Sequence, residues 1–367
     1  MSKVKIETLT SVHIGSGETL QYGNDFVKGK ADDDDMIGII DPKKVMQLIG
    51  EDKIDAWVIA IDNGRPTDQI VKQYAPKAKI EDYSQRLILP WFLLKNTDTL
   101  KEQIYDGLGR PYIPGSSIKG AIRTAVLASM LNQETGLENK IRDFKGKVTA
   151  KNVEFEFLGK DPNSDVFRFL QVGDAFFGDN YTVAIRMVNI NERKSSGFWD
   201  ESKSQLIEAI CPEDESTFEM KLNSKLYDWA KDKVHKMPNC MSSLSELFKT
   251  INNHTKALIT KDIQYWKNYS DIDDSGKVDN YIEKMCKMLS VTNVCKEGES
   301  CVLRIGYGSG WCFITGAWAK KLENFADDVV PASRPKNRNY SEYDFPKTRR
   351  VDDNCELLGF VKLSLVK

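Results

Sequence analysis

The stretch that decides the fold, residues 109–124, reads GRPYIPGSSIKGAIRT. A Pro-Gly turn leads into two serines. Behind them, apolar residues recur at the spacing of one buried helical face: Ile118, Ala121, Ile122, Ala125 and Val126. The pattern predicts a helix over 117–132. Ser116 or Ser117 is expected to cap it by accepting a hydrogen bond from an otherwise unpaired backbone N–H.

The start of this helix has the chemistry of an anion site. Lys119 and Arg123 are four residues apart and share a face, and Gly120 between them lets another backbone come close. Together with the two serine hydroxyls and free backbone amides, they make a sensible seat for a phosphate group. Taken alone, the same residues also describe a capped helix with two solvated cations.

A second motif is the glycine-rich loop 306–310. Glycine at every second position, Gly306, Gly308 and Gly310, permits positive φ and exposes successive N–H groups that can hold phosphate oxygens. The loop also contains Ser309. It is neither a P-loop nor G-x-G-x-x-G, so nucleotide-cofactor binding is not expected. The structural alternative is a tight turn from a strand into a helix.

Two aromatic residues accompany this loop. Tyr307 and Trp311 have the rings needed to stack on bases, as ribonucleoprotein sheets commonly do. Packing inside the protein is an equal alternative for Trp311.

Both stretches, together with the N-terminal IETLTSVHIGSGE at 6–18, resemble the motifs of the RAMP superfamily of CRISPR-associated RNA-binding proteins. The order and separation of the motifs are most similar to those in the family of the fifth Csm subunit of type III-A effector complexes, and the closing LGFVKL at 358–363 suits that family's last strand. The resemblance implies two ferredoxin-like (RRM-like) domains. It also implies RNA contact by the helix start and the glycine loop.

The same resemblance implies a function in antiviral defence. The chain would be a non-catalytic subunit that binds crRNA, caps the filament of Csm backbone subunits at the 3′ side of the crRNA, and is required for crRNA 3′-end maturation. A recruited host nuclease would do the trimming. No cofactor or metal is implied.

Length and composition limit the class of protein to which this chain can belong. The chain has 367 residues, enough for two cores, and no apolar run approaches the ~20 residues that span a bilayer. It enters a strand pattern directly, so no signal peptide is expected. The seven cysteines form no C-x-x-C pair and have spacings unsuited to zinc, which favours reduced thiols in a cytoplasmic protein.

Charge argues against RNA binding by bulk attraction, because the formal net charge is −2. A local groove is therefore required. The segment 333–350 is strongly basic and includes Arg334, Arg338 and Arg350, which we expect to form a secondary RNA-binding patch. A solvated basic loop would have the same composition.

Mixed short strands and helices predict an α+β fold. We expect an N-terminal ferredoxin-like domain over 1–175 with a helical insertion at about 43–105. A C-terminal ferredoxin-like domain over 176–367 would carry a helical insertion at about 200–290 and the glycine-rich loop. Strands are predicted at 3–12 (ending in a glycine turn at 15–17), 36–40, 153–158, 166–172, 181–190, 301–305 and 357–366, and a further helix at 313–322. The segment 218–222 fits either a strand or a helix.

Two other functions stay open at this stage. His13 beside a glycine turn has a pKa suited to a general base, which would suit a metal-independent endoribonuclease processing CRISPR transcripts; the default for His13 is support of the turn and RNA contact. A protein–protein adaptor without RNA contact is the other alternative. The acidic run 32–35 and Asp25 invite a metal or catalytic interpretation, but a solvated loop is favoured.

Overall fold

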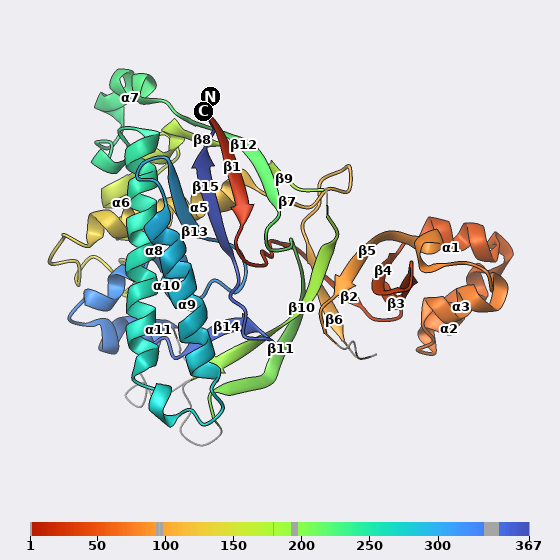
Figure 1. The fold of residues 1–367 in the computed structure, drawn as a ribbon. Helices are drawn as coiled ribbons and strands as arrows, with labels where there is room; N and C mark the ends of the chain where they lie inside the picture. The colour runs from red at the N-terminus through yellow and green to blue at the C-terminus, as the bar shows by residue number, and fades with distance from the viewer. Residues whose placement is uncertain are drawn as a thin grey trace.

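The structure is a computed structural model that describes residues 2–92, 95, 98–178, 180–191, 197–333 and 345–366. It consists of a large lobe, in which helices cover one sheet, and a smaller helical lobe, with long strands running between them (Figure 1). The first and last strands pair with each other, so the two termini lie side by side.

The large lobe is built on an antiparallel sheet. Its strand order is β13 (Ser300–Arg304), β15 (Phe360–Leu365), β1 (Ser2–Thr8), β12 (Glu215–Leu222) and β8 (Leu170–Val172). Alternate residues of β1, Val4 and Ile6, are fully buried, as expected for a strand with one covered face. They share one core with residues of α5 (Gly115–Leu131) and α8 (Leu244–Lys267).

The second sheet connects the lobes. Its strand order is β2 (Gly15–Gln21), β6 (Thr99–Gln103), β11 (Trp199–Ala209), β10 (Thr182–Asn191), β5 (Ser84–Pro90), β4 (Asp34–Ile40) and β3 (Phe26–Ala31), and β14 (Thr348–Asp352) also pairs with β10. A short pair is formed by β7 (Tyr112–Ile113) and β9 (Ala175–Phe176). Strand β10 pairs with both β5 and β14, so one strand joins residues 84–90 to residues 348–352.

The remaining helices fall into two groups. The small lobe contains α1 (Pro42–Ile49), α2 (Ile54–Asp62), α3 (Thr67–Tyr74) and α4 (Ile80–Tyr83), which pack around a core of their own with β3 and β4. The large lobe contains α6 (Lys151–Leu158), α7 (Ser224–Ala230), α9 (Lys277–Val294), α10 (Trp311–Thr315) and α11 (Val330–Ser333). No described helix combines the length and the apolar character needed to cross a membrane.

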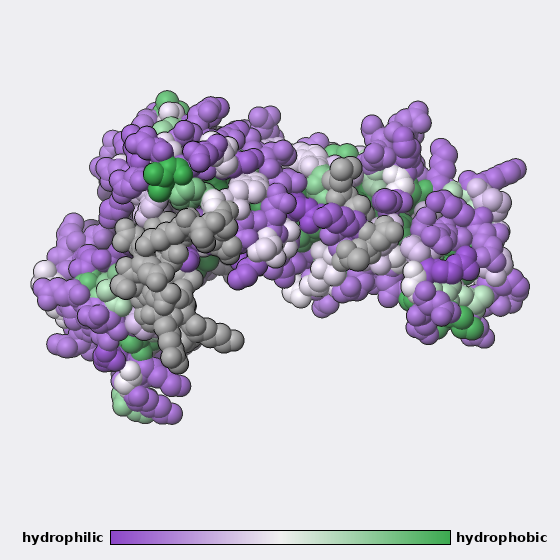
Figure 2. Space-filling model, turned by 90° about the horizontal axis from the view of Figure 1, so that it is seen from below, coloured by the Kyte–Doolittle hydropathy of each residue, from purple (hydrophilic) through white to green (hydrophobic). Residues whose placement is uncertain are grey.

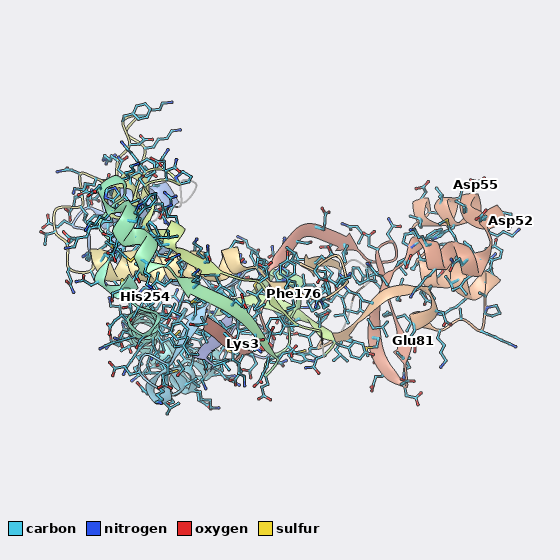
Figure 3. All side chains as sticks on the ribbon, turned by 90° about the horizontal axis from the view of Figure 1, so that it is seen from above. Lys3, Asp52, Asp55, Glu81, Phe176 and His254 are labelled. Atoms are coloured by element: carbon cyan, nitrogen blue, oxygen red, sulfur yellow. The ribbon has the colours of Figure 1, made fainter. Side chains whose placement is uncertain are left out.

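The surface is mostly polar. In the view from below, hydrophilic side chains dominate and hydrophobic ones form small separate patches, some of them on the small lobe (Figure 2). Exposed apolar residues of that lobe include Val58 and Ile59 on α2, while Asp52 and Asp55 lie at its far end (Figure 3).

The α+β prediction is confirmed, and the long signature helix, the strands at 36–40 and 181–190, and the last strand lie close to where the sequence placed them. Both sheets combine strands from either side of residue 175. The division into 1–175 and 176–367 therefore does not coincide with the two sheets. As a division into domains it stays a prediction.

Several local predictions are wrong. Residues 153–158 alternate like a strand but form α6, because Val153 and Phe157, one helical turn apart, pack on the core of the large lobe. The glycine turn expected at 15–17 is the start of β2. Only 170–172 of the strand expected at 166–172 is extended, and it follows a 3-10 turn.

The region 201–222 is not helical. It forms β11 and β12, so the strand alternative for 218–222 is confirmed, and helices begin only at α7. The helix expected at 313–322 is broken after α10 by Gly316 and Ala317, both of which have positive φ. In each case long-range pairing or packing decides between local patterns that the sequence leaves nearly equal.

Candidate nucleic-acid interface

Four segments far apart in the sequence line one groove, which we call the central groove. The N-terminal motif contributes Ile14 and Gly15, and Ser117 comes from the first turn of α5. The glycine loop contributes Gly306, Tyr307, Gly308, Gly310 and Trp311. The groove has a volume of about 800 Å³, and its other lining residues are Asn189, Ile314, Phe345, Pro346, Lys347, Thr348 and Arg350. The two cations among these come from the basic C-terminal segment.

The glycine loop has the backbone geometry that its spacing predicts. Gly306, Gly308 and Gly310 have φ values of 78°, 92° and 83°. The loop is attached to the N-terminal motif, because the Tyr307 N–H donates to the His13 carbonyl over 2.9 Å. Within the described part of the chain, no acceptor takes the N–H groups of Gly308 and Gly310. Gly308 is buried, whereas Gly310 is partly exposed, so the Gly310 amide is available to a ligand in the groove.

Ser309 has a different role from the glycines. Its hydroxyl donates to the Gly306 carbonyl over 2.7 Å, and the residue is buried. The side chain therefore closes the loop on itself and leaves contact with a ligand to the backbone.

Tyr307 lies between two cations. The Arg350 guanidinium is 4.8 Å from the ring centroid and the Lys101 ammonium is 5.7 Å away, while the phenol donates to Gln205 over 2.6 Å. This holds the ring rigidly beside the groove. Trp311 instead packs edge-on against Phe345, at a centroid distance of 5.1 Å, which favours the packing alternative for that residue.

His13 is a buried structural residue. Its side chain is 3% exposed, and Nδ1 donates to the Glu208 carbonyl over 2.5 Å. Burial lowers the pKa of His13. The hydrogen bond to Glu208 and the negative charge of Glu208 act in the opposite direction, but their effect is smaller. In this position His13 supports the glycine loop, because its carbonyl accepts from the Tyr307 N–H.

We predict that the neutral state of His13 makes the fold acid-sensitive. In the unfolded chain its pKa is near 6.5, so the unfolded state takes up a proton that the folded state refuses. The contribution of neutral His13 to the free energy of unfolding is complete above that pH, and it is lost as the pH is lowered below it. His13→Gln should therefore lose less free energy of unfolding than the wild type between about pH 7 and about pH 5, measured by urea denaturation.

Equal losses in the two chains would contradict this prediction. His254, whose pKa burial lowers to about 4, acts in the same direction but is present in both chains and cancels in the comparison.

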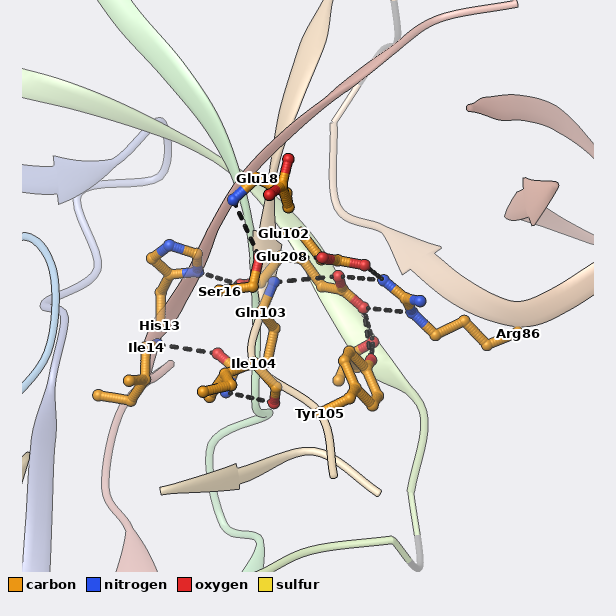
Figure 4. Close-up of polar contacts among 11 residues, drawn as sticks. His13, Ile14, Ser16, Glu18, Arg86, Glu102, Gln103, Ile104, Tyr105 and Glu208 are labelled. Carbon is orange, nitrogen blue, oxygen red and sulfur yellow. Dashed lines mark hydrogen bonds and ion pairs between the residues drawn. The ribbon is translucent and has the colours of Figure 1, made fainter. Parts of the chain in front are cut away.

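A buried polar cluster in the second sheet lies next to His13 of the N-terminal motif (Figure 4). The Glu208 carboxylate on β11 is fully buried and accepts hydrogen bonds from Arg86, Tyr105 and Thr182. The backbone N–H of Gln103 donates to the same carboxylate over 3.2 Å. The charge and hydrogen bonds of Glu208 raise the pKa of Arg86 against the opposing effect of burial. This cluster ties the neighbouring strands β5, β6 and β10 to Glu208 on β11, the residue that His13 contacts.

The expected cap of the signature helix is wrong. The cap residue is Pro114, and neither serine side chain makes a capping bond. The amide of Gly115 is not free, because it donates to the Asp174 carboxylate over 2.7 Å. A carboxylate of the chain itself thus satisfies part of the helix dipole that was expected to attract a phosphate.

The structure separates the signature cations from the glycine loop. Ser116, Lys119, Gly120 and Arg123 line a second groove, which we call the lateral groove. Its other residues are Phe155, Gly159, Lys160, Asp161, Pro162, Asp165, Phe167 and Arg168. Of the helix start, only Ser117 reaches the central groove.

Arg123 is largely neutralised within the fold. Its guanidinium contacts the Asp165 carboxylate at 2.7 Å and Glu154 at 3.6 Å, and lies 5.3 Å from the centroid of Phe167. It holds the loop after α6 against α5. Lys119 makes no ion pair with any described residue.

The remaining candidate residues are Arg334, Arg338, the acidic run 32–35 and Asp25. Arg334 and Arg338 lie outside the described residues, so the basic segment is represented in the groove by Lys347 and Arg350. The acidic run 32–35 forms the exposed end of the β3–β4 hairpin, and the described residues contain no cluster suited to hold a metal ion. Asp25 accepts from the Gln21 N–H over 2.7 Å in a turn.

Some site residues were missed by sequence reasoning. Glu208 gave a signal, since it is a lone carboxylate inside the apolar run Leu206–Ile210, which is typical of a buried and paired charge. Lys101, Lys160 and Arg168 gave none, because nothing local connects them to the motifs that they face.

The fold and the groove define a class of protein, and the family comparison agrees. Residues 5–312 match the RAMP superfamily, and the chain belongs to that superfamily. Within it, the chain is similar to the CRISPR system protein Csm5 of Methanocaldococcus jannaschii, with 25% identity over 301 residues. That match covers 80% of this chain and 62% of the relative's length.

Two solved structures have the same fold. One is a chain of a Csm–crRNA–target RNA ternary complex of a type III-A CRISPR–Cas system, with a TM-score of 0.73, 19% identity, and 99% and 100% of the two chains covered. The other is Csm5 of T. onnurineus, with a TM-score of 0.66, 16% identity, and 97% and 99% covered. The resemblance to Csm5-like RAMP proteins is confirmed.

Proposed function

We propose that this protein is a non-catalytic crRNA-binding subunit of a type III-A effector complex. One observation carries the proposal. The N-terminal motif, the start of the signature helix, the glycine loop and the basic C-terminal segment all line the central groove, although they are spread over the whole chain. Membership of the RAMP superfamily supports RNA as the ligand.

The chemistry of the groove suits an RNA backbone. The amide of Gly310 is oriented by positive φ and has no internal acceptor among the described residues. Lys347 and Arg350 supply positive charge beside it. A net charge of −2 then presents no conflict, because binding depends on the local field of the groove.

The finer parts of the function follow from the similarity to Csm5 proteins. The subunit would cap the 3′ side of the crRNA filament next to the Csm backbone subunits and be required for crRNA 3′-end maturation by a recruited nuclease in the cytoplasm. The buried, hydrogen-bonded His13 argues against the endoribonuclease alternative. The adaptor alternative is an outcome of the experiment below.

We predict that Lys347→Ala/Arg350→Ala reduces crRNA recovery. The tagged chain would be purified from its native host and the small RNAs that accompany it sequenced. Loss of two phosphate contacts should lower RNA recovery roughly tenfold, and the remaining crRNAs should have ragged, over-long 3′ ends. The matched control is Lys72→Ala/Lys77→Ala, which removes the same charge from the exposed surface of the small lobe.

Two results would contradict the proposal. Wild-type protein that recovers its partner subunits without crRNA would establish the adaptor alternative. Equal RNA recovery by the groove variant and the control would remove the central groove from the interface.

A further inference from the structure

Arg349 and Arg350 are consecutive residues of β14, and their side chains lie on opposite faces of the strand, as successive side chains of a strand do. The Arg350 guanidinium lies 4.8 Å from the centroid of the Tyr307 ring and lines the central groove. Arg349 is buried on the other side, where its guanidinium lies 5.7 Å from the Trp266 ring of α8. The basic C-terminal segment therefore gives one arginine to the groove and one to the interior.

A carboxylate on α8 holds the inward arginine. Asp262 is buried, and its Oδ1 accepts from Nε of Arg349 over 2.7 Å and lies 2.5 Å from a second guanidinium nitrogen. The other carboxylate oxygen accepts from the Tyr281 hydroxyl of α9 over 2.6 Å. Within the part of the chain that the structure describes, Asp262 is the carboxylate that forms an ion pair with Arg349. One side chain thus joins α8, α9 and β14.

Arg349 in turn shapes one wall of the central groove. Its remaining guanidinium nitrogen donates to the Pro346 carbonyl over 2.6 Å and to the Thr348 carbonyl over 3.1 Å. Residues 345–348 and Arg350 line the groove, and we call 345–350 the C-terminal wall. The buried guanidinium therefore closes the backbone turn from which this wall is made.

Stability alone does not account for a buried pair of this kind. Removing both charges from water costs about as much as their attraction returns, and apolar side chains of similar volume often serve a fold equally well. What the pair adds is a defined geometry, because a planar guanidinium and a carboxylate bond only in particular orientations. In this protein, the geometry that it defines is that of the C-terminal wall.

We propose that Asp262 is a positioning residue for RNA binding. Acting through Arg349, it holds the C-terminal wall in the arrangement that presents Lys347 and Arg350 to the phosphates. The proposal rests on the proposed function of the central groove. It gives α8 and α9 a part in binding, although neither Asp262 nor Tyr281 lines the groove, and it assigns Arg349 an indirect role.

The first test measures binding of a fluorescently labelled single-stranded RNA to the purified chain by anisotropy. Asp262→Asn removes a negative charge, so the electrostatic field alone would strengthen binding. We expect binding to weaken roughly tenfold instead, as loss of the phosphate contacts of the wall would produce. Equal affinity of the variant and the wild type would overturn the proposal.

The matched control is Asp68→Asn in the small lobe. The Asp68 side chain is 14% exposed and pairs with Lys72 at 2.9 Å, so the control also removes one charge from a largely buried ion pair. Its RNA affinity should equal that of the wild type or exceed it. All variants are compared at a temperature at which circular dichroism shows that they are folded.

A double-mutant cycle separates positioning from a general loss of structure. In the Lys347→Ala/Arg350→Ala background, Asp262→Asn should change the RNA affinity by less than about twofold, because the wall no longer carries the cations that it positions. A further tenfold loss in that background would show that Asp262 acts independently of the wall, and the positioning role would be wrong.

Arg349→Lys separates positioning from direct contact with RNA. Lysine keeps the charge, so it would largely replace an arginine that only met a phosphate. It lacks the planar fork that joins Asp262 to the Pro346 carbonyl, and we therefore expect a loss of affinity similar to that of Asp262→Asn. Wild-type affinity of this variant would exclude the indirect role of Arg349.

If Asp262→Asn does not fold, Asp262→Leu/Arg349→Met takes its place. This exchange leaves the net charge unchanged and fills the space with apolar side chains, which buried ion pairs often tolerate. The Pro346 carbonyl still loses its donor, so RNA binding should fall roughly tenfold. Undiminished binding by the folded double variant would refute the proposal.

The outcomes also separate this inference from the proposed function. If Lys347→Ala/Arg350→Ala loses binding while Asp262→Asn and Arg349→Lys bind as the wild type does, the positioning role fails and the central groove stands as the interface. If the wild-type chain binds no RNA, or if Lys347→Ala/Arg350→Ala binds as the wild type does, the proposed function fails together with the inference.

Discussion

Glu208→Ala is expected to lower the free energy of unfolding by about 3–5 kcal/mol. The carboxylate is fully buried, and its removal leaves the Arg86 guanidinium, whose side chain is 15% exposed, without its main partner. The hydroxyls of Tyr105 and Thr182 lose an acceptor at the same time. Urea denaturation followed by circular dichroism would measure the loss.

The matched control is Glu102→Ala. Glu102 contacts the same guanidinium at 2.9 Å but is 21% exposed, so water can replace it and a loss of about 1 kcal/mol or less is expected. Similar losses for the two variants would contradict a special role for the buried carboxylate. If Glu208→Ala does not fold, Glu208→Gln, which keeps the shape and one acceptor, should fold with a smaller loss.

Gly306→Ala is expected to cost about 3 kcal/mol and to weaken RNA binding with it. A Cβ at this position would lie 2.5 Å from the His13 carbonyl oxygen, the same atom that accepts from the Tyr307 N–H. The backbone φ of 78° adds strain for any side chain. The loop would have to leave the N-terminal motif, and this would open the central groove.

Gly310→Ala isolates the steric part of that effect. Its φ of 83° imposes a similar strain, but a Cβ there would meet no atom within 4 Å, so a loss of only about 1 kcal/mol is expected. Thermal or urea unfolding of the two variants gives the comparison, and RNA anisotropy gives the functional consequence. Equal stability losses would show that contact with His13 does not hold the loop.

Local patterns predicted the features that depend on local physics. The apolar spacing from Ile118 to Val126 predicted α5, since one stripe of a helix must be buried. The alternating glycines predicted positive φ in the loop that carries Tyr307, because only glycine adopts that region without strain. The resemblance carried by the same motifs gave the family.

The wrong secondary-structure predictions fall on segments whose local pattern fits both a strand and a helix. Residues 153–158 alternate as a strand would, but α6 buries Val153 and Phe157 against the large lobe. Leu206 and Ile207 fit a helix, but β11 finds partners in β10 and β6. Whether such a segment becomes a helix or a strand depends on packing and pairing partners that are distant in the sequence.

The sequence by itself thus determined the signature helix, the geometry of the glycine loop and membership of the superfamily. Only the tertiary structure decided how the motifs combine. It placed Asp174 on the Gly115 amide, fixed His13 on Glu208, and put Lys119 in a different groove from the glycine loop. The His13–Glu208 contact joins residues 195 positions apart. The physical reason is that hydrogen bonds and ion pairs act over a few ångströms of space, and only the folded chain sets which residues come within that range.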